Sequence, residues 1–236
     1  MGKSTFKEYN INLHGKQYIV LTPWSEQLDM WIELWATVPG GDWDYSVLGR
    51  KEFKFLRDSY IALTQNPYYI IYFPLHNAEK VSSTNYTQIQ PDFVIYTHQS
   101  QLKRKEWIDI KNCIKHIKPK QRVIRFHMPS LFKEFDKMMH QWKKKKTYYR
   151  YSGWKYRDEE RLFYQHETCF IQSSVRQALY AAIDIHNALE KDLETEMEEH
   201  QFLQYTAGSR CGGISYEFAT KEFLKRRESQ DWRYIY

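Results

Sequence analysis

Two kinds of hydrophobic spacing alternate along the chain and predict a protein that contains both helices and strands. Apolar residues recur every three to four positions over 24–38 and over 47–66, which is the spacing of an amphipathic helix. Pro67 is expected to end the second of these helices, because the residue before a proline disfavours helical geometry. Short runs rich in Ile, Val, Tyr and Phe predict strands, and they lie at 17–22, 68–75, 92–97, 106–114 and 122–128.

After Ser130 the helical spacing returns, and it predicts a C-terminal part made of helices. These helices are expected at 130–142, 157–167, 171–203 and 217–229, with a loop at 40–46 and a hairpin turn at 118–120. The fold class is therefore α/β (mixed, α+β-like), with a central, mostly antiparallel or mixed sheet of about four to five strands flanked by helices. Because no flexible linker interrupts the chain, we expect one domain over 1–236, with a core at about 47–142 and a helical extension at about 143–236.

Composition narrows the classes of protein that fit. The chain has 236 residues, a formal net charge of +6 and 17% aromatic residues, so it can bury a sizeable core and is unlike a disordered chain. Its three cysteines form no CxxC pair, which favours free thiols over a zinc site. No leader and no apolar run of about 18 residues is present, so we expect a cytoplasmic, intracellular protein with no membrane partner.

The stretch KEWIDIKN at 105–112 places an acid and a lysine two residues apart in apolar surroundings. On a strand, Asp109 and Lys111 would share one face, and Asp92 at the entrance of the preceding strand would come close to them. Two interpretations remain open: a structural ion pair at a sheet edge, or the charged part of a catalytic site. Two carboxylates can hold Mg²⁺, which polarises a phosphodiester, while a nearby lysine orients water or offsets negative charge.

The pattern PDFVIY followed by KEWIDIKN resembles the PD-(D/E)XK nucleases, and most of all the orthodox type II restriction endonucleases. The resemblance implies that Asp92 and Asp109 are metal ligands and that Lys111 is the catalytic lysine. It also implies a glutamate from the helix before the sheet, a place that Glu52 fits. The family usually has a substantial helix after the lysine strand, whereas 113–121 leaves room only for a short turn.

A basic segment at 140–157 suggests a polyanionic partner. Its cations alternate with aromatic residues, so that the former can neutralise phosphates and the latter can stack on bases. The alternative is a solvated helix end with its aromatic residues in the core. The candidate DNA-binding residues are Lys143, Lys144, Lys145, Lys146, Arg150, Lys155 and Arg157.

The sequence-based hypothesis is thus a Mg²⁺-dependent DNA endonuclease, in particular a type II restriction enzyme, that acts on double-stranded DNA. A homodimer is expected, because cutting both strands of a two-fold site requires two symmetric active sites. The alternative is a non-catalytic DNA-associated protein, such as a phage structural or packaging component, in which Asp109 and Lys111 have a structural role.

Overall fold

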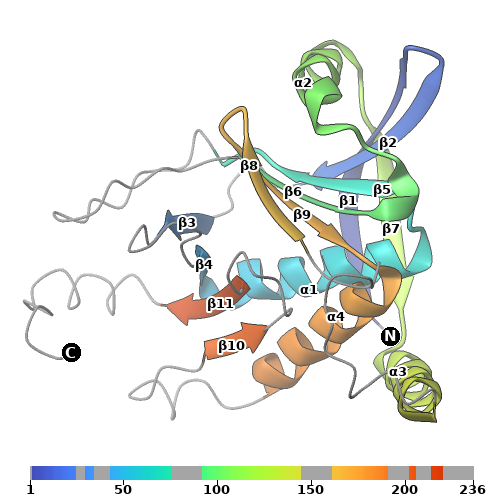
Figure 1. The fold of residues 1–236 in the computed structure, drawn as a ribbon, viewed down its shortest axis with the longest axis vertical. Coiled ribbons are helices and arrows are strands. Elements are labelled where there is room, and N and C mark those ends of the chain that lie inside the picture. Colours follow the sequence, from blue (N-terminus) through green and yellow to red (C-terminus); the bar gives the residue numbers. More distant parts are fainter. Residues whose placement is uncertain are drawn as a thin grey trace, which may run out of the picture.

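A computed structural model describes residues 2–24, 30–34, 43–75, 92–144, 161–190, 202–205 and 214–219. Over these ranges the chain forms a seven-stranded sheet, a four-stranded sheet and four α-helices (Figure 1). The large sheet has the strand order β7-β1-β2-β5-β6-β9-β8 and mixes parallel with antiparallel pairs. The predicted mixed α/β class is therefore confirmed, although the sheet is larger than the four to five strands expected.

The strands of the large sheet come from both halves of the chain. They are β1 (Gly2–Leu13), β2 (Lys16–Pro23), β5 (Tyr69–Phe73), β6 (Asp92–Thr97), β7 (Lys120–Phe126), β8 (Arg161–Gln165) and β9 (Thr168–Ser173). A two-residue turn joins β1 to β2, and both His14 and Gly15 have positive φ angles, of 49° and 75°. Such a turn matches the twist of a tight hairpin. The small sheet consists of four strands, β3 (Met30–Leu34), β4 (Trp43–Leu48), β10 (Phe202–Tyr205) and β11 (Ile214–Ala219).

Helices bury both faces of the large sheet, which explains the uninterrupted apolar runs of β5 and β6. On one face, α1 (Gly49–Gln65) and α4 (Val175–Glu190) cover a core that includes Phe6, Leu21, Ile71 and Phe93. On the other face, α2 (Trp107–His116) packs Trp107 and Ile110 against a second core that includes Tyr18, Val20, Ile70 and Val94. The helix α3 (Met128–Lys144) packs beside α4, and two short 3-10 helices, η1 (His98–Ser100) and η2 (Arg104–Glu106), precede α2.

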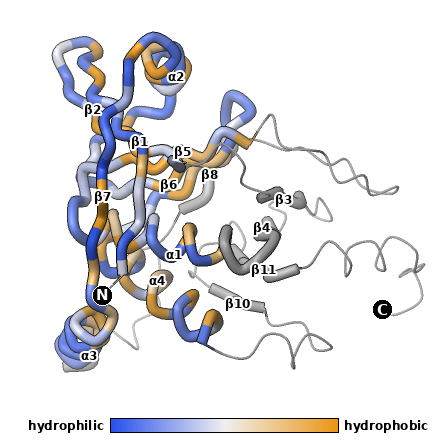
Figure 2. Tube along the Cα trace, turned by 180° about the vertical axis from the view of Figure 1, so that it is seen from behind, coloured by the Kyte–Doolittle hydropathy of each residue, from blue (hydrophilic) through white to orange (hydrophobic). Residues whose placement is uncertain are grey.

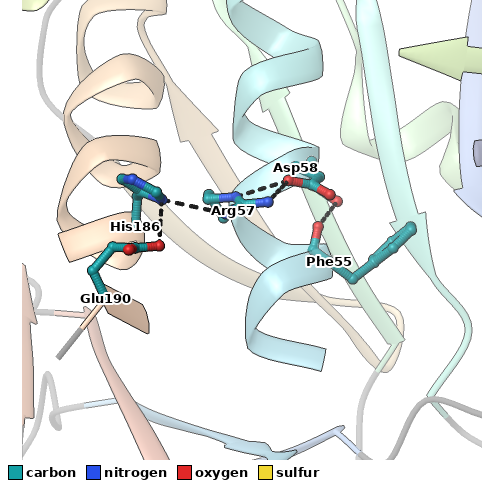
Figure 3. A network of polar contacts seen from close by, with 6 residues as sticks. Phe55, Arg57, Asp58, His186 and Glu190 are labelled. Atoms are coloured by element: carbon teal, nitrogen blue, oxygen red, sulfur yellow. Dashed lines mark hydrogen bonds and ion pairs between the residues drawn. The ribbon is translucent and has the colours of Figure 1, made fainter. Parts of the chain in front are cut away.

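A charged network lies between α1 and α4 (Figure 3). Arg57 donates two hydrogen bonds to Oδ1 of Asp58, at 2.7 and 2.8 Å, and both residues are buried. Its Nη1 atom lies 3.3 Å from Nδ1 of His186, which is 3.9 Å from the carboxylate of Glu190. Burial raises the pKa of Asp58 against the opposing effect of Arg57, while burial and the charge of Arg57 lower the pKa of His186. The contact between α1 and α4 thus includes two titratable groups, Asp58 and His186, whose pKa values are shifted because the packed helices bury them.

The predicted strand at 106–114 is wrong, because this segment forms η2 and α2 instead. Its buried positions are Trp107 and Ile110, and Ile114 and Ile117 are partly buried against the same core. Those positions recur every three to four residues, as on a helix, whereas Ile108, which a strand would pair with Ile110, is 44% exposed. The predicted hairpin turn at 118–120 consequently joins α2 to β7.

Several other segments predicted as helix or loop contain strands. The strand β3 lies within 24–38, β4 overlaps the predicted loop at 40–46, and β8 lies within 157–167. The predicted long helix at 171–203 is divided among β9, α4 and β10, and β11 reaches into 217–229. The C-terminal part is therefore not wholly helical: β8 and β9 complete the large sheet, where parallel pairing with β6 buries Cys169, Phe170 and Ile171.

The remaining predicted elements are close to those observed. The strand 92–97 has the bounds of β6, and α1, α3, β2, β5 and β7 lie within a few residues of their predicted ranges. The strand β1 is absent from the predicted elements, because its exposed and partly buried positions interrupt the apolar pattern. None of the helices in the described ranges has the length and apolarity needed to cross a lipid bilayer.

Candidate functional site

Asp92 opens β6 as a buried carboxylate held by two donors. Its side chain is only 2% exposed, and its Oδ2 atom accepts a hydrogen bond of 2.8 Å from Nζ of Lys111 and one of 3.0 Å from the hydroxyl of Tyr72. Tyr72 comes from the neighbouring strand β5, where its register partner is Val94. Burial, together with the negative charge of Asp92, raises the pKa of Tyr72. The phenol therefore stays protonated and acts as the donor of the hydrogen bond to Asp92.

The packing of α2 explains why Lys111 reaches Asp92. Trp107 is fully buried, and its ring meets the ring of Tyr72 edge-on at a centroid distance of 5.0 Å. Lys111 follows Trp107 by four residues and therefore lies on the same side of the helix, one turn further along. Its side chain is 25% exposed, so the stem crosses the edge of the core and the ammonium reaches the carboxylate. The pair of Asp92 and Lys111, called the clasp below, fastens α2 to β6.

Asp109 does not join the clasp. It lies two residues before Lys111 on the same helix, which turns it by about 200° away from that lysine. Its side chain is exposed, in the first turn of α2, where a negative charge favours the helix dipole. The structure therefore brings Asp92 and Lys111 together and leaves Asp109 apart from both.

The other predicted catalytic residue, Glu52, belongs to α1. That helix covers the face of the sheet opposite to α2, and the side chain of Glu52 lies outside the described residues. Of the predicted DNA-binding residues, Lys143 and Lys144 end α3 with only their backbone described. Lys145, Lys146, Arg150, Lys155 and Arg157 lie outside the described ranges.

The clasp does not fit the magnesium site that the motif implies. Mg²⁺ needs a site rich in oxygen ligands, whereas the one carboxylate present here is already bonded to an ammonium and a phenol. Within the described ranges, no group of three His, Cys, Asp or Glu residues is arranged to hold a metal ion. What the clasp does chemically is to compensate a buried charge and to fix the position of α2.

A basic surface around α2 was missed by the sequence reasoning. Residues 101–127 contain nine Lys and Arg against two Asp and Glu, a formal charge of +7, although the whole chain carries only +6. The signal was present in the sequence, but it was hidden because, apart from 103–105, these cations are spread singly along the segment. The α2 basic surface consists of Lys16 from the hairpin, Lys103, Arg104 and Lys105 from the start of the helix, and Lys115 and Lys118 from its end.

Contacts at the start of α2 hold this surface together. The hydroxyl of Tyr18 in β2 donates a hydrogen bond of 2.5 Å to Glu106, which lowers the pKa of that glutamate, as do the nearby charges of Lys16 and Lys103. The guanidinium of Arg104 lies 3.5 Å from the ring centroid of Phe163 in β8. Lys103, Lys105, Lys115 and Lys118 are exposed. The helix α2 and the β1–β2 hairpin lie at the same end of the molecule in both views (Figures 1 and 2).

Comparison with known proteins adds no assignment: no family model, no curated protein and no solved structure matches the chain.

Proposed function

We propose that the chain is a non-catalytic protein that binds double-stranded DNA and in which the clasp has a structural role. The observation that carries this proposal is the concentration of net positive charge in residues 101–127. This segment contributes +7, so the remainder of the chain is close to neutral. Two of its cations, Lys111 and Arg122, are paired with Asp92 and Glu8, and its other lysines are exposed. Cations gathered on one surface neutralise phosphates and release counterions from a duplex, which is the main source of affinity for nucleic acids.

The geometry of the clasp supports the non-catalytic part of the proposal. Lys111 is bonded to Asp92, and Asp109 is turned toward solvent, so the three charged groups of the PD and D-x-K elements do not converge on one point. A catalytic constellation needs its groups within reach of a single reacting atom. A buried, compensated pair that fastens a helix to a strand needs no substrate to explain it.

A salt titration tests the proposal. We expect the affinity for a duplex to fall steeply with salt, and the variant Lys105→Gln/Lys118→Gln to lower the log–log slope by about 0.9 for each phosphate that it no longer neutralises. The matched control is Lys133→Gln/Lys137→Gln, which removes two exposed charges from α3, near the opposite end of the molecule in Figure 1. An unchanged slope in the first variant, or an equal reduction in the control, would contradict binding at α2.

A second candidate is the Mg²⁺-dependent endonuclease that the motif resembles, acting as a homodimer. The observation in its favour is that Asp92 and Lys111 do meet, at 2.8 Å, as the motif requires of its lysine and one carboxylate. Incubation of a plasmid with the protein, with and without Mg²⁺, tests this candidate. Metal-dependent cleavage that Lys111→Ala abolishes while the variant remains folded would favour the endonuclease over the non-catalytic proposal.

A further inference from the structure

The exposed face of α2 is separated cleanly from its buried face. The side chains of Ile108, Asp109, Asn112, Lys115 and His116 are exposed and recur at the spacing of one helical stripe. None of them is hydrogen-bonded to another described residue, and Ile108 is 44% exposed. This face has no covering element within the described part of the chain.

The chemistry of this face matches the edges of base pairs. An asparagine amide can both donate and accept, which suits the N6 and N7 atoms of adenine, an aspartate accepts from the N4 atom of cytosine, and an apolar side chain contacts the methyl group of thymine. Asn112, Asp109 and Ile108 provide these three types on adjacent turns of one helix. Helix α2 has ten residues and is therefore about 15 Å long, and an α-helix with its side chains is about 10–12 Å across, which suits a major groove about 12 Å wide.

The surroundings of the face match the DNA backbone. Exposed cations flank α2 at both ends, with Lys103 and Lys105 before it and Lys118 after it. This arrangement follows the division of labour in DNA complexes, in which phosphate contacts position the protein and base contacts specify the sequence. The clasp and the buried Trp107 fix the rotation of α2, so the polar face is held in one orientation before any DNA binds.

The features of α2 and its flanks favour double-stranded DNA over single strands and over RNA as the partner of this surface. Binding of single strands relies on exposed aromatic rings that stack on bases. The exposed aromatic residues among those described are Trp24, Tyr68 and Tyr180, none of which belongs to α2 or its flanks. Duplex RNA has a major groove too deep and narrow for a helix to enter.

We propose that α2 enters the major groove of double-stranded DNA and that Asn112 reads an adenine edge there. The inference rests on the proposed function and deepens it, since binding through phosphates alone needs no helix in a groove. Asp109 then has a role in base contact in place of metal binding, and Lys111 is a positioning residue that acts through the orientation of α2.

The first experiment selects preferred duplexes from a randomised DNA pool with the wild-type protein. We expect a preferred site that contains adenine, bound at least about tenfold more tightly than unrelated duplex DNA, and weaker binding to the same sequence as duplex RNA or as a single strand. Salt-dependent binding without any preferred sequence would overturn the inference and leave the proposed function intact. No binding to any nucleic acid would overturn both.

The second experiment tests Asn112 on the selected site. We expect Asn112→Ala to lose about 5- to 150-fold in discrimination at one A·T pair, with an unchanged salt slope. Replacing that adenine by 7-deazaadenine, which lacks the N7 acceptor, should weaken binding of the wild type and leave Asn112→Ala unaffected. The matched control is Asn187→Ala, which changes an exposed asparagine on α4. Wild type and Asn112→Ala that respond equally to 7-deazaadenine would overturn the assignment.

Discussion

Asp92 shows how one buried charge determines the roles of its neighbours. Its carboxylate is almost fully removed from water, where an ion is costly unless it is paired and hydrogen-bonded. Lys111 supplies the compensating charge, and Tyr72 supplies a neutral donor whose raised pKa keeps its proton in place. Removal of Lys111 therefore leaves a buried carboxylate without its compensating charge.

Replacement of Lys111 by alanine is expected to destabilise the fold. Breaking a buried pair costs about 3–5 kcal/mol, and the lower end applies here because the lysine side chain is a quarter exposed. Urea denaturation measures the loss, and Lys115→Ala on the exposed face of the same helix should change the free energy of unfolding by no more than about 0.5 kcal/mol. The double variant Asp92→Asn/Lys111→Met should be more stable than the sum of its single variants implies, because it leaves no uncompensated charge. Equal stability of Lys111→Ala and Lys115→Ala would show that the clasp contributes nothing.

At the scale of elements, the interface of α1 with α4 responds to pH through His186. A histidine whose folded pKa is lowered contributes stability that is present above its ordinary value of 6.5 and is lost as the pH falls through the folded value. The cause is that a protonated ring would be buried beside the guanidinium of Arg57, whereas the neutral ring accepts a hydrogen bond from that guanidinium through Nδ1. Glu190 and the aromatic side chain of Phe132 also lie near the ring, and Asp58 is bonded to the same Arg57.

We expect the free energy of unfolding to decrease as the pH falls below 6.5, and His186→Gln to reduce this dependence. Glutamine retains an acceptor for Arg57 but does not titrate. Asp58, whose pKa is raised, contributes in the opposite sense, since its stabilisation is present below 3.8 and is lost as the pH rises through its folded value. The free energy of unfolding of wild type and of His186→Gln is measured from about pH 8 to about pH 5, and the difference between the two pH profiles gives the contribution of His186. Parallel curves for wild type and variant would exclude it as the cause.

The elements that sequence reasoning found are those in which the local pattern and the tertiary environment agree. The strand β6 is buried throughout, and α1 has an apolar stripe and Pro67 just beyond its end. The segment 105–112 was wrongly predicted as a strand because Ile108 and Ile110 suggest alternation. The wider set of Trp107, Ile110 and Ile114 has helical spacing. The sequence correctly predicted that Asp92 and Lys111 lie close together, but it assigned their proximity to two adjacent strands. In the structure it arises because α2 packs across the strands.

At the scale of the whole molecule, charge is distributed unevenly over the sheet and its helices. Strand β7 at one edge of the sheet begins with three hydrophilic residues and carries its hydrophobic residues in its second half (Figure 2). Arg122 on this strand is hydrogen-bonded to the buried Glu8 of β1, which lowers the pKa of that glutamate. Part of the positive charge of 101–127 is thus neutralised within the fold, and exposed cations remain both on β7 and around α2.

The lysine run at 143–146 remains a prediction that is independent of α2. If it binds phosphates, neutralising Lys143 to Lys146 should weaken binding to all duplex sequences alike and lower the salt slope by about 0.9 per phosphate. Combining this change with Asn112→Ala should give additive effects, because one set contributes affinity and the other discrimination. An unchanged slope in the same salt titration would mean that the run is only solvated.

The pairing of β6 with β9 has a consequence for how the chain is made. Asp92 is in register with Thr168, so one edge of β6 stays unpaired until a far later part of the chain has been synthesised. Distant pairings of this kind slow folding, and an apolar strand with a free edge invites association with other chains. A charge at the end of such a strand opposes that association, as gatekeeper residues do. We therefore expect the carboxylate that anchors α2 in the finished protein also to oppose association of the nascent chain until β9 has paired with β6.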